Sequence, residues 1–145
     1  MSRILTPLLL AALTLTVFAK LQDFGPESTL RRFHQAAIRG DVPTIDATTA
    51  EGANSPFVQA LAQGIRSYAE TGAPIQPLGM MRGPGEAICE VAYADRQSGM
   101  SVHLWVLKLR GRTWKINAEA TYLGWRQSPG PRSDRPAVDR DPTSG

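Results

Sequence analysis

Two stretches far apart in the chain constrain its fold more than anything else in the sequence. In residues 26–41, apolar side chains recur every three to four positions, the pattern of a helix that buries one face. In residues 100–122, two β-rich runs flank Arg110-Gly111-Arg112, the pattern of an antiparallel hairpin. A one-sided helix needs an apolar surface to cover, and a one-sided sheet supplies it. The pair predicts an α+β domain in which N-terminal helices pack on a curved antiparallel sheet.

The helical segments all precede the strands. A first helix is expected from Pro26, whose fixed φ suits the first helical turn, to a C-cap at Gly40. Asp41 is the expected N-cap of a short helix through about residue 47. Ser55 then opens a longer helix, which is expected to end near residue 72.

Four strands are expected after these helices, over residues 75–81, 87–95, 101–109 and 113–122. In the last hairpin, Gly111-Arg112 suits a two-residue turn that pairs Leu109 with Trp114. This register turns one set of side chains toward the core: His103, Trp105, Leu107, Leu109, Trp114, Ile116, Ala118 and Ala120. A three-residue turn would instead set Glu119 opposite His103, and it ranks second because it also turns a lysine inward.

Two registers remain open for the strand over residues 87–95. One turns Cys89, Val91 and Tyr93 toward the core. The other turns Ile88, Glu90 and Ala92 inward and brings the Glu90 carboxylate near the imidazole of His103, a pair able to perform acid–base chemistry. Burial favours the first register, because an unpaired buried carboxylate costs several kcal/mol.

The N-terminus reads as a targeting segment. Residues 4–19 carry no charge and lie between Arg3 and Lys20. At about 1.5 Å per residue this run is shorter than the roughly 30 Å hydrocarbon core of a bilayer, which favours a signal peptide cleaved after Ala19. A retained transmembrane helix acting as an anchor is the alternative, since a bilayer can thin or a helix tilt. Either way, an extracytoplasmic domain is expected, secreted, periplasmic or held at the membrane by this segment.

The rest of the chain divides into a domain over residues 20–125 and a tail over residues 126–145. The tail is rich in Pro, Arg and Asp, lacks apolar residues to bury, and is predicted to be disordered. Basic and acidic residues, 16 and 13 in number, are interspersed along the chain, so no basic block indicates nucleic-acid binding. The single cysteine, Cys89, has no disulfide partner within the chain and is expected to be a buried apolar residue on a strand.

The helix ending in Arg39-Gly40-Asp41-Val42 and the strand Trp114-Lys115-Ile116 resemble the nuclear-transport-factor-like superfamily, which includes SnoaL-like and ketosteroid-isomerase-like proteins. The resemblance covers about residues 26–123. It implies a cystatin-like cone, lined by helices and closed by a bent sheet. In that superfamily the pocket of the cone is catalytic in some members and ligand-binding or filled in others.

The candidate pocket residues are His103, Trp105, Tyr93 and Tyr68, an imidazole among aromatic side chains. The same side chains could simply fill a core, with His103 hydrogen-bonded to backbone or water. His34 and Asp46 are interpreted as solvent-exposed positions on a helix and at a helix end. No catalytic residue, metal site or cofactor is assigned, because the two histidines lie far apart and no paired acidic spacing accompanies them.

These observations lead to three hypotheses. The first is an exported or membrane-tethered non-enzymatic domain with a binding or assembly role. The second is a small-molecule-binding protein or an enzyme that uses the cone, with His103 as acid or base supported by Glu90 or Asp46, and with a small apolar ligand as its partner. The third is a homodimer formed through an exposed sheet face that carries Val102, Leu104 and Val106.

Overall fold

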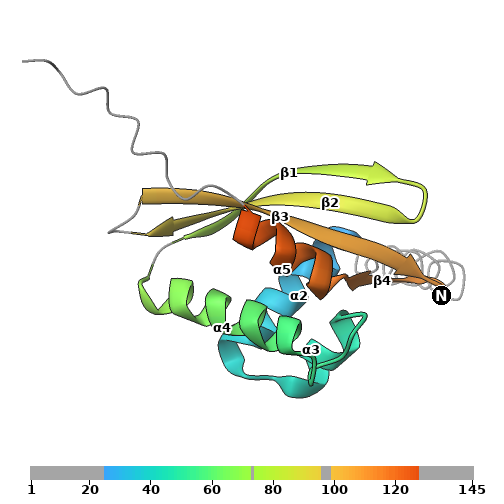
Figure 1. The fold of residues 1–145 in the computed structure, drawn as a ribbon, viewed down its shortest axis with the longest axis horizontal. Helices are drawn as coiled ribbons and strands as arrows, with labels where there is room; N and C mark the ends of the chain where they lie inside the picture. Colours follow the sequence, from blue (N-terminus) through green and yellow to red (C-terminus); the bar gives the residue numbers. More distant parts are fainter. Residues whose placement is uncertain (1–24, 73, 96–98, 128–145) are drawn as a thin grey trace, which may run out of the picture.

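The structure is a computed structural model that describes residues 25–72, 74–95 and 99–127. Three helices come first: α2 (Pro26–Arg39), α3 (Val42–Thr48) and α4 (Pro56–Glu70). The strands β1 (Ile75–Gly83), β2 (Glu86–Asp95), β3 (Gly99–Arg110) and β4 (Thr113–Ile116) follow, and then the helix α5 (Ala118–Gln127). The strands form one antiparallel sheet in the order β1-β2-β3-β4, with the helices on one of its faces (Figure 1). The predicted α+β class and four-stranded sheet are confirmed.

Helix α2 begins and ends at the residues that the sequence predicts. Pro26 occupies the first turn, and Gly40 closes the helix in the left-handed conformation with φ of 70°. The next residue, Asp41, starts α3 because its carboxylate accepts hydrogen bonds from the backbone N–H and the hydroxyl of Thr44. These bonds lower the pKa of Asp41. Both predicted helix boundaries are therefore confirmed.

The predicted pairing of the last hairpin and the favoured register of the preceding strand are also confirmed. Leu109 pairs with Trp114, and Cys89 pairs with Trp105. Cys89, Val91 and Tyr93 face the helices and are buried. The alternative register is wrong: Glu90 is exposed on the opposite face, where solvent keeps its carboxylate hydrated.

The last predicted strand is wrong beyond Ile116, because the chain turns into α5. The Asn117 side chain accepts a hydrogen bond from the N–H of Ala120 at 3.1 Å. The carboxylate of Glu51 accepts from the N–H groups of Ala118 and Glu119, at 3.0 and 3.3 Å. These side chains satisfy the donors that a helix start leaves without partners. Ala118 and Ala120 are therefore helical, and the three-residue turn with Glu119 opposite His103 does not occur.

Helix α5 lies along the part of the β3 edge with which a longer β4 would have paired. The N–H of Asn117 donates to the carbonyl of Val106 at 2.8 Å, and the N–H of Val106 donates to the hydroxyl of Thr121 at 3.1 Å. The side chain of Thr121 is fully buried. The helix thus covers a strand edge and brings Trp125 into the core.

The core lies between α2, α4, α5 and the inner face of β2 and β3. Its largest fully buried side chains are Trp105, Tyr93, Phe33, Leu61, Ile65 and Leu107. Strand β1 stands at the edge of the sheet, and a bulge between Pro77 and Gly79 shifts its register against β2. Between the inner face of β1 and α2, sheet and helix do not close on each other.

No helix among the described residues is long and apolar enough to cross a membrane. The expectation of a transmembrane helix is not met in that part of the chain. The predicted signal or anchor segment, residues 1–19, lies outside the described residues. So does the predicted tail from residue 128 onward, whereas residues 126 and 127 belong to α5.

Candidate functional site

His34 lies inside the fold, contrary to the expectation of an exposed helix position. It stands four residues after Leu30 on the inner side of α2 and is only 8% exposed. Its Nδ1 donates to the carbonyl of Leu30 at 2.8 Å, which leaves Nε2 to accept from the hydroxyl of Tyr93 at 2.7 Å. Burial lowers the pKa of His34 from 6.5 to about 4. The ring is therefore neutral at physiological pH.

The Tyr93 hydroxyl has a second partner, the indole of Trp105. Trp105 Nε1 donates to this oxygen at 2.8 Å, while the hydroxyl proton goes to His34. Burial raises the pKa of Tyr93. A directed chain of hydrogen bonds therefore runs from Trp105 through Tyr93 and His34 to the backbone of Leu30. Every polar atom along it is satisfied, so the chain offers no free donor or acceptor to a ligand.

The structure brings the four predicted pocket residues together. The rings of Tyr68 and Tyr93 stack with centroids 4.7 Å apart, the centroid of His103 lies 5.5 Å from that of Tyr93, and Trp105 hydrogen-bonds Tyr93. They meet in a packed aromatic cluster, in which Tyr93 and Trp105 are fully buried. Direct ligand binding by these four residues stays a prediction.

His103 lies at the margin of this cluster and is half-buried. Its ring stacks on Trp125 with centroids 4.4 Å apart, and Nε2 lies 3.4 Å from the Tyr68 hydroxyl. Desolvation lowers the pKa of His103. Within the described ranges its Nδ1 has no hydrogen-bond partner, and no carboxylate bonds its ring. Glu90 faces the other side of the sheet, and Asp46 accepts a hydrogen bond from the N–H of Ala53 in a turn. The acid–base pair considered for the second hypothesis is not assembled.

A cleft of about 540 Å³ lies between α2 and the edge strand β1. We call it the α2–β1 cleft. Its apolar lining consists of Leu30, Ile38, Ile75, Pro77, Leu78, Gly79, Met80, Cys89 and Val91. Its polar lining consists of Glu27, Arg31, His34 and Gln35, all on α2. None of the four predicted pocket residues lines it.

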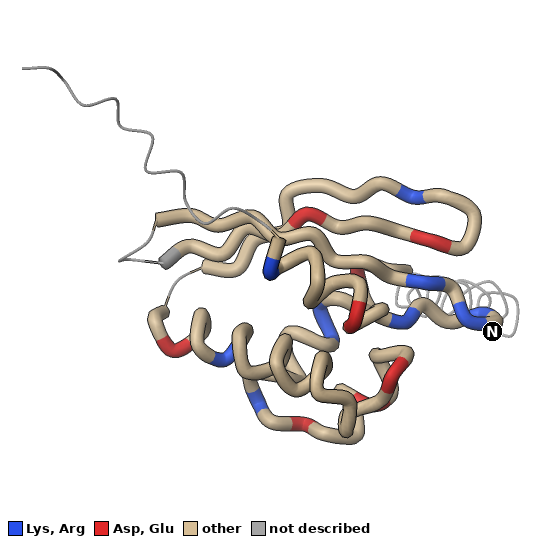
Figure 2. Tube along the Cα trace, viewed as in Figure 1, with Lys and Arg blue, Asp and Glu red and all other residues tan. Residues whose placement is uncertain are grey.

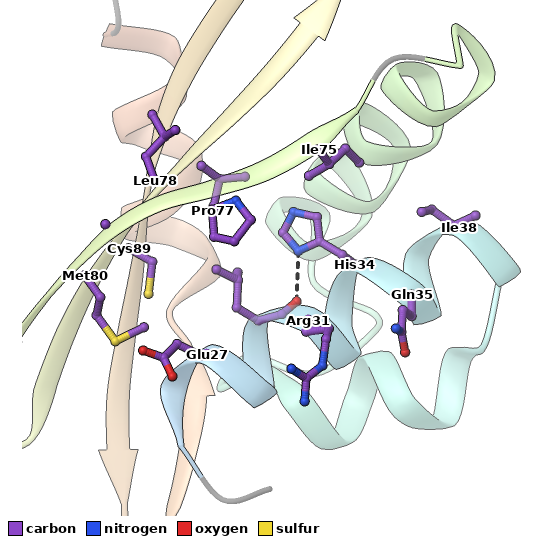
Figure 3. A pocket seen from close by; sticks show the side chains of 13 residues that line it. Glu27, Arg31, His34, Gln35, Ile38, Ile75, Pro77, Leu78, Met80 and Cys89 are labelled. Carbon is purple, nitrogen blue, oxygen red and sulfur yellow. Dashed lines mark hydrogen bonds between the residues drawn. The ribbon is translucent and has the colours of Figure 1, made fainter. Parts of the chain in front are cut away.

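Figure 3 shows how the side chains of the α2–β1 cleft are arranged. Ile75 and Pro77 of β1 stand over the ring of His34, whose hydrogen bond to the Leu30 carbonyl is drawn as a dashed line. Met80 and Cys89 close one end of the cleft. Arg31 and Gln35 extend away from the interior along the outer side of α2. The interior is therefore apolar and its polar groups stand at the rim.

Cys89 contributes a sulfur to the cleft wall and is 1% exposed. Burial is the main reason that its pKa rises from 9.0 to about 11, and the nearby Glu27 carboxylate acts in the same direction. The thiol is therefore protonated and weakly reactive at neutral pH. The expectation of a buried, apolar cysteine on a strand is confirmed. Among the described residues, no group of three His, Cys, Asp or Glu side chains is placed to hold a metal ion.

Sequence reasoning missed both His34 and the α2–β1 cleft. The spacing of Leu30, His34 and Ile38 by four residues was a usable signal, because it places all three on one side of a helix. The polarity of imidazole argued against burial. Its tertiary partner, the Tyr93 hydroxyl, removes that objection.

Comparison with known proteins assigns no family. No family model matches the chain, and no curated protein matches it significantly. Among solved structures, the chain is similar to a SEC-C motif containing protein from Rhodopseudomonas palustris, with a TM-score of 0.41 and 17% sequence identity over 63% of this chain and 74% of that one. This finding corrects the expected resemblance to the nuclear-transport-factor-like superfamily and its SnoaL-like members. The similarity is too low to carry function from one protein to the other.

Proposed function

We propose that this protein is an extracytoplasmic, non-enzymatic binding domain that holds a small apolar ligand in the α2–β1 cleft. The cleft itself is the observation that carries the proposal. Its volume of about 540 Å³ falls within the range of roughly 300–1,000 Å³ that small-molecule sites occupy. In this proposal the helices and the bent sheet form a cystatin-like cone, filled by the aromatic cluster and open at the cleft.

The hydrogen bonds inside the fold set the chemical class of the ligand. His34 is the polar side chain deepest in the cleft wall, and both of its nitrogens already have protein partners. The thiol of Cys89 is neutral and a weak hydrogen-bond donor. A polar group buried in the cleft would therefore lose its hydration without gaining a partner, which costs free energy. A hydrocarbon or aromatic group binds there without that penalty.

Fluorescence titration with N-phenyl-1-naphthylamine, an uncharged apolar probe, tests the cleft. Ile38 lines the cleft mouth and is 48% exposed, so Ile38→Glu places a charge there without disturbing the core. Probe affinity is expected to fall about tenfold or more, since binding would bring the apolar probe against a charge that must stay hydrated.

Val42→Glu is the matched control, because Val42 is also an exposed apolar residue, 58% exposed, but lies outside the cleft lining. Its affinity for the probe is expected to equal that of the native protein. Absence of a fluorescence increase with the native protein, or equal losses in the two variants, would contradict the proposal.

The extracytoplasmic location rests on the uncharged run at residues 4–19. A fusion of alkaline phosphatase to the C-terminus tests it, because that enzyme forms its disulfides and becomes active only outside the cytoplasm. Activity of the fusion is expected, and an inactive fusion made in normal amounts would contradict export. The intact mass of the exported chain then distinguishes cleavage after Ala19 from retention of the segment at the membrane.

A further inference from the structure

The sheet face that turns away from the helices carries an apolar patch. Alternation along the strands places five of its side chains on that face, and we call them the outer-face patch: Met81, Ile88, Val102, Leu104 and Val106. Met81, Leu104 and Val102 are 64%, 45% and 41% exposed. No described helix packs on this face, which lies opposite α2, α4 and α5 (Figure 1). Contiguous apolar surface of this kind on a folded domain marks an interaction site.

The face is large enough for a specific interface. Strands β1, β2 and β3 have 9, 10 and 12 residues. At about 3.3 Å per residue and 4.8 Å between strands, they span roughly 30 Å by 15 Å. Two such faces together bury on the order of 1,000 Å², close to the lower limit of stable protein–protein interfaces. An association of modest, micromolar strength fits this area.

Charged side chains of both signs also lie on this face, beside and between the patch residues. The exposed residues Glu86 and Glu90 lie on β2, whereas Lys108 lies on β3. Figure 2 shows the acidic positions on β2 and the basic positions toward the β3–β4 end of the sheet. The face therefore carries acidic side chains on β2 and a basic side chain on β3, so a rotated copy can place opposite charges against each other.

The charges also select the direction of the rotation axis. A two-fold axis across the strands near Leu104 would set Glu90 against its own copy, because Glu90 and Leu104 are paired neighbours. An axis along the strands, between β2 and β3, sets β2 of one copy over β3 of the other, so that Glu90 stands over Leu104 of the second copy and not over its own counterpart. Glu86 then stands over Lys108, at the level where the two already pair within one chain. Aligned face-to-face packing of two sheets is a common arrangement.

We infer that the outer-face patch is the interface of a symmetric homodimer, with its two-fold axis along the strands. The partner is a second copy of this chain, since a face with both charge signs and a central apolar stripe complements itself. The α2–β1 cleft lies on the other side of the sheet, so the dimer leaves both clefts open. The inference does not depend on what the cleft binds.

Sedimentation velocity of the full chain, from low micromolar to near-millimolar concentration, tests the dimer. The native protein is expected to change from monomer to dimer within this range. Val102→Thr/Leu104→Thr removes apolar surface from the patch and places threonine, a β-branched residue that suits a strand, at both positions. The dissociation constant is expected to rise about tenfold or more.

Leu123→Gln is the matched control, because Leu123 on α5 is 45% exposed, as Leu104 is. This variant is expected to dimerise as the native protein does. A native protein that stays monomeric, or a Val102→Thr/Leu104→Thr variant that dimerises normally, would overturn the inference. Binding of the monomer to lipid vesicles in place of dimerisation would overturn it too, and would indicate a membrane as the partner of the patch.

Charge reversal tests the direction of the axis. Glu86→Lys and Lys108→Glu each place like charges against one another in the proposed dimer, so each is expected to weaken it several-fold at low salt. The double variant Glu86→Lys/Lys108→Glu restores opposite charges and is expected to recover native affinity. Additive weakening in the double variant would rule out an axis along the strands.

Discussion

The Tyr93 hydroxyl lies 2.7 Å from Nε2 of His34, 59 residues earlier in the chain. This contact joins the first helix of the described fold to the middle of its sheet. It satisfies the one histidine nitrogen that the helix backbone leaves without a partner, and the same hydroxyl satisfies the indole of Trp105. The contact thus allows a polar ring to stand in the wall of an apolar cleft.

Removal of this hydroxyl is expected to be strongly destabilising. Tyr93→Phe leaves His34 Nε2 and Trp105 Nε1 buried without partners, at about 1–3 kcal/mol for each group. We therefore expect the free energy of unfolding, measured with urea, to fall by about 2–6 kcal/mol. Tyr68→Phe is the control, because the Tyr68 hydroxyl is only partly buried and makes longer contacts, of 3.2 and 3.4 Å. Equal losses in the two variants would refute this account of Tyr93.

The pKa of His34 predicts how stability depends on pH. Its native pKa of about 4 lies below the unfolded value of 6.5, so between these values the unfolded chain binds more protons. The stability that neutral His34 supports is complete above about pH 6.5 and is lost as the pH falls toward 4, by about 3 kcal/mol. Urea unfolding at several pH values measures this slope. His34→Gln cannot titrate, so its free energy of unfolding is expected to fall by about 3 kcal/mol less than that of the native protein between pH 6.5 and pH 4. An equal fall in the two proteins would count against the assignment.

Gly64 is expected to tolerate a methyl group poorly. A Cβ at this position on α4 would lie 3.0 Å from the Trp125 ring, which is itself held against His103 and Trp105. A glycine-to-alanine change within a helix normally stabilises by about 1 kcal/mol, but overpacking costs about 1–3 kcal/mol. We expect Gly64→Ala to lower the thermal midpoint and to shift tryptophan fluorescence.

Gly124 provides the matched comparison for Gly64. It also lies within a helix, α5, and a Cβ there would meet no heavy atom within 4 Å. Gly124→Ala is therefore expected to raise the free energy of unfolding by about 0.5–1 kcal/mol. If both variants were stabilised equally, Trp125 would not be packed against Gly64 as the structure has it.

The start of α5 depends on side chains as well as on its own sequence. Asn117→Ala removes the acceptor for the N–H of Ala120 and is expected to cost about 1 kcal/mol. Glu51→Gln keeps one oxygen acceptor but removes the negative charge at the positive end of the helix, and is expected to cost somewhat less. Urea unfolding measures both losses. Native stability in Asn117→Ala would show that the cap does not determine where α5 begins.

Local signals in the sequence were sufficient for the boundaries of the first helices and for the pairing of the last hairpin. Pro26 and Gly40 act through their own φ angles, which do not depend on the rest of the fold. The two-residue turn at Gly111-Arg112 sets the register of the hairpin by its length alone. The burial of Cys89, Val91 and Tyr93 follows from alternation, because the other register would bury the Glu90 carboxylate without a partner.

The prediction of a strand beyond Ile116 was wrong because the contacts that favour a helix there come from residues distant in sequence. The segment over residues 118–122 is short, and its sequence fits a strand or a helix. The carboxylate that caps α5 belongs to Glu51, 67 residues before Ala118. Hydrogen bonds of Asn117 and Thr121 with the backbone of Val106, at the edge of β3, then favour the helix over a strand. Neither contact can be inferred from spacing along the chain.

The sequence by itself determined an α+β domain, its first helices and the inner face of its sheet, since periodicity and turn chemistry act over a few residues. Only the tertiary structure decided that His34 is buried, that α5 replaces the end of the last strand, and that β1 stands apart from α2 to leave a cleft. Each of these depends on a partner distant in sequence: the Tyr93 hydroxyl, the Glu51 carboxylate and the bulge of β1 against β2. The solvation of a polar group is set by what surrounds it in space, and sequence neighbours do not reveal that.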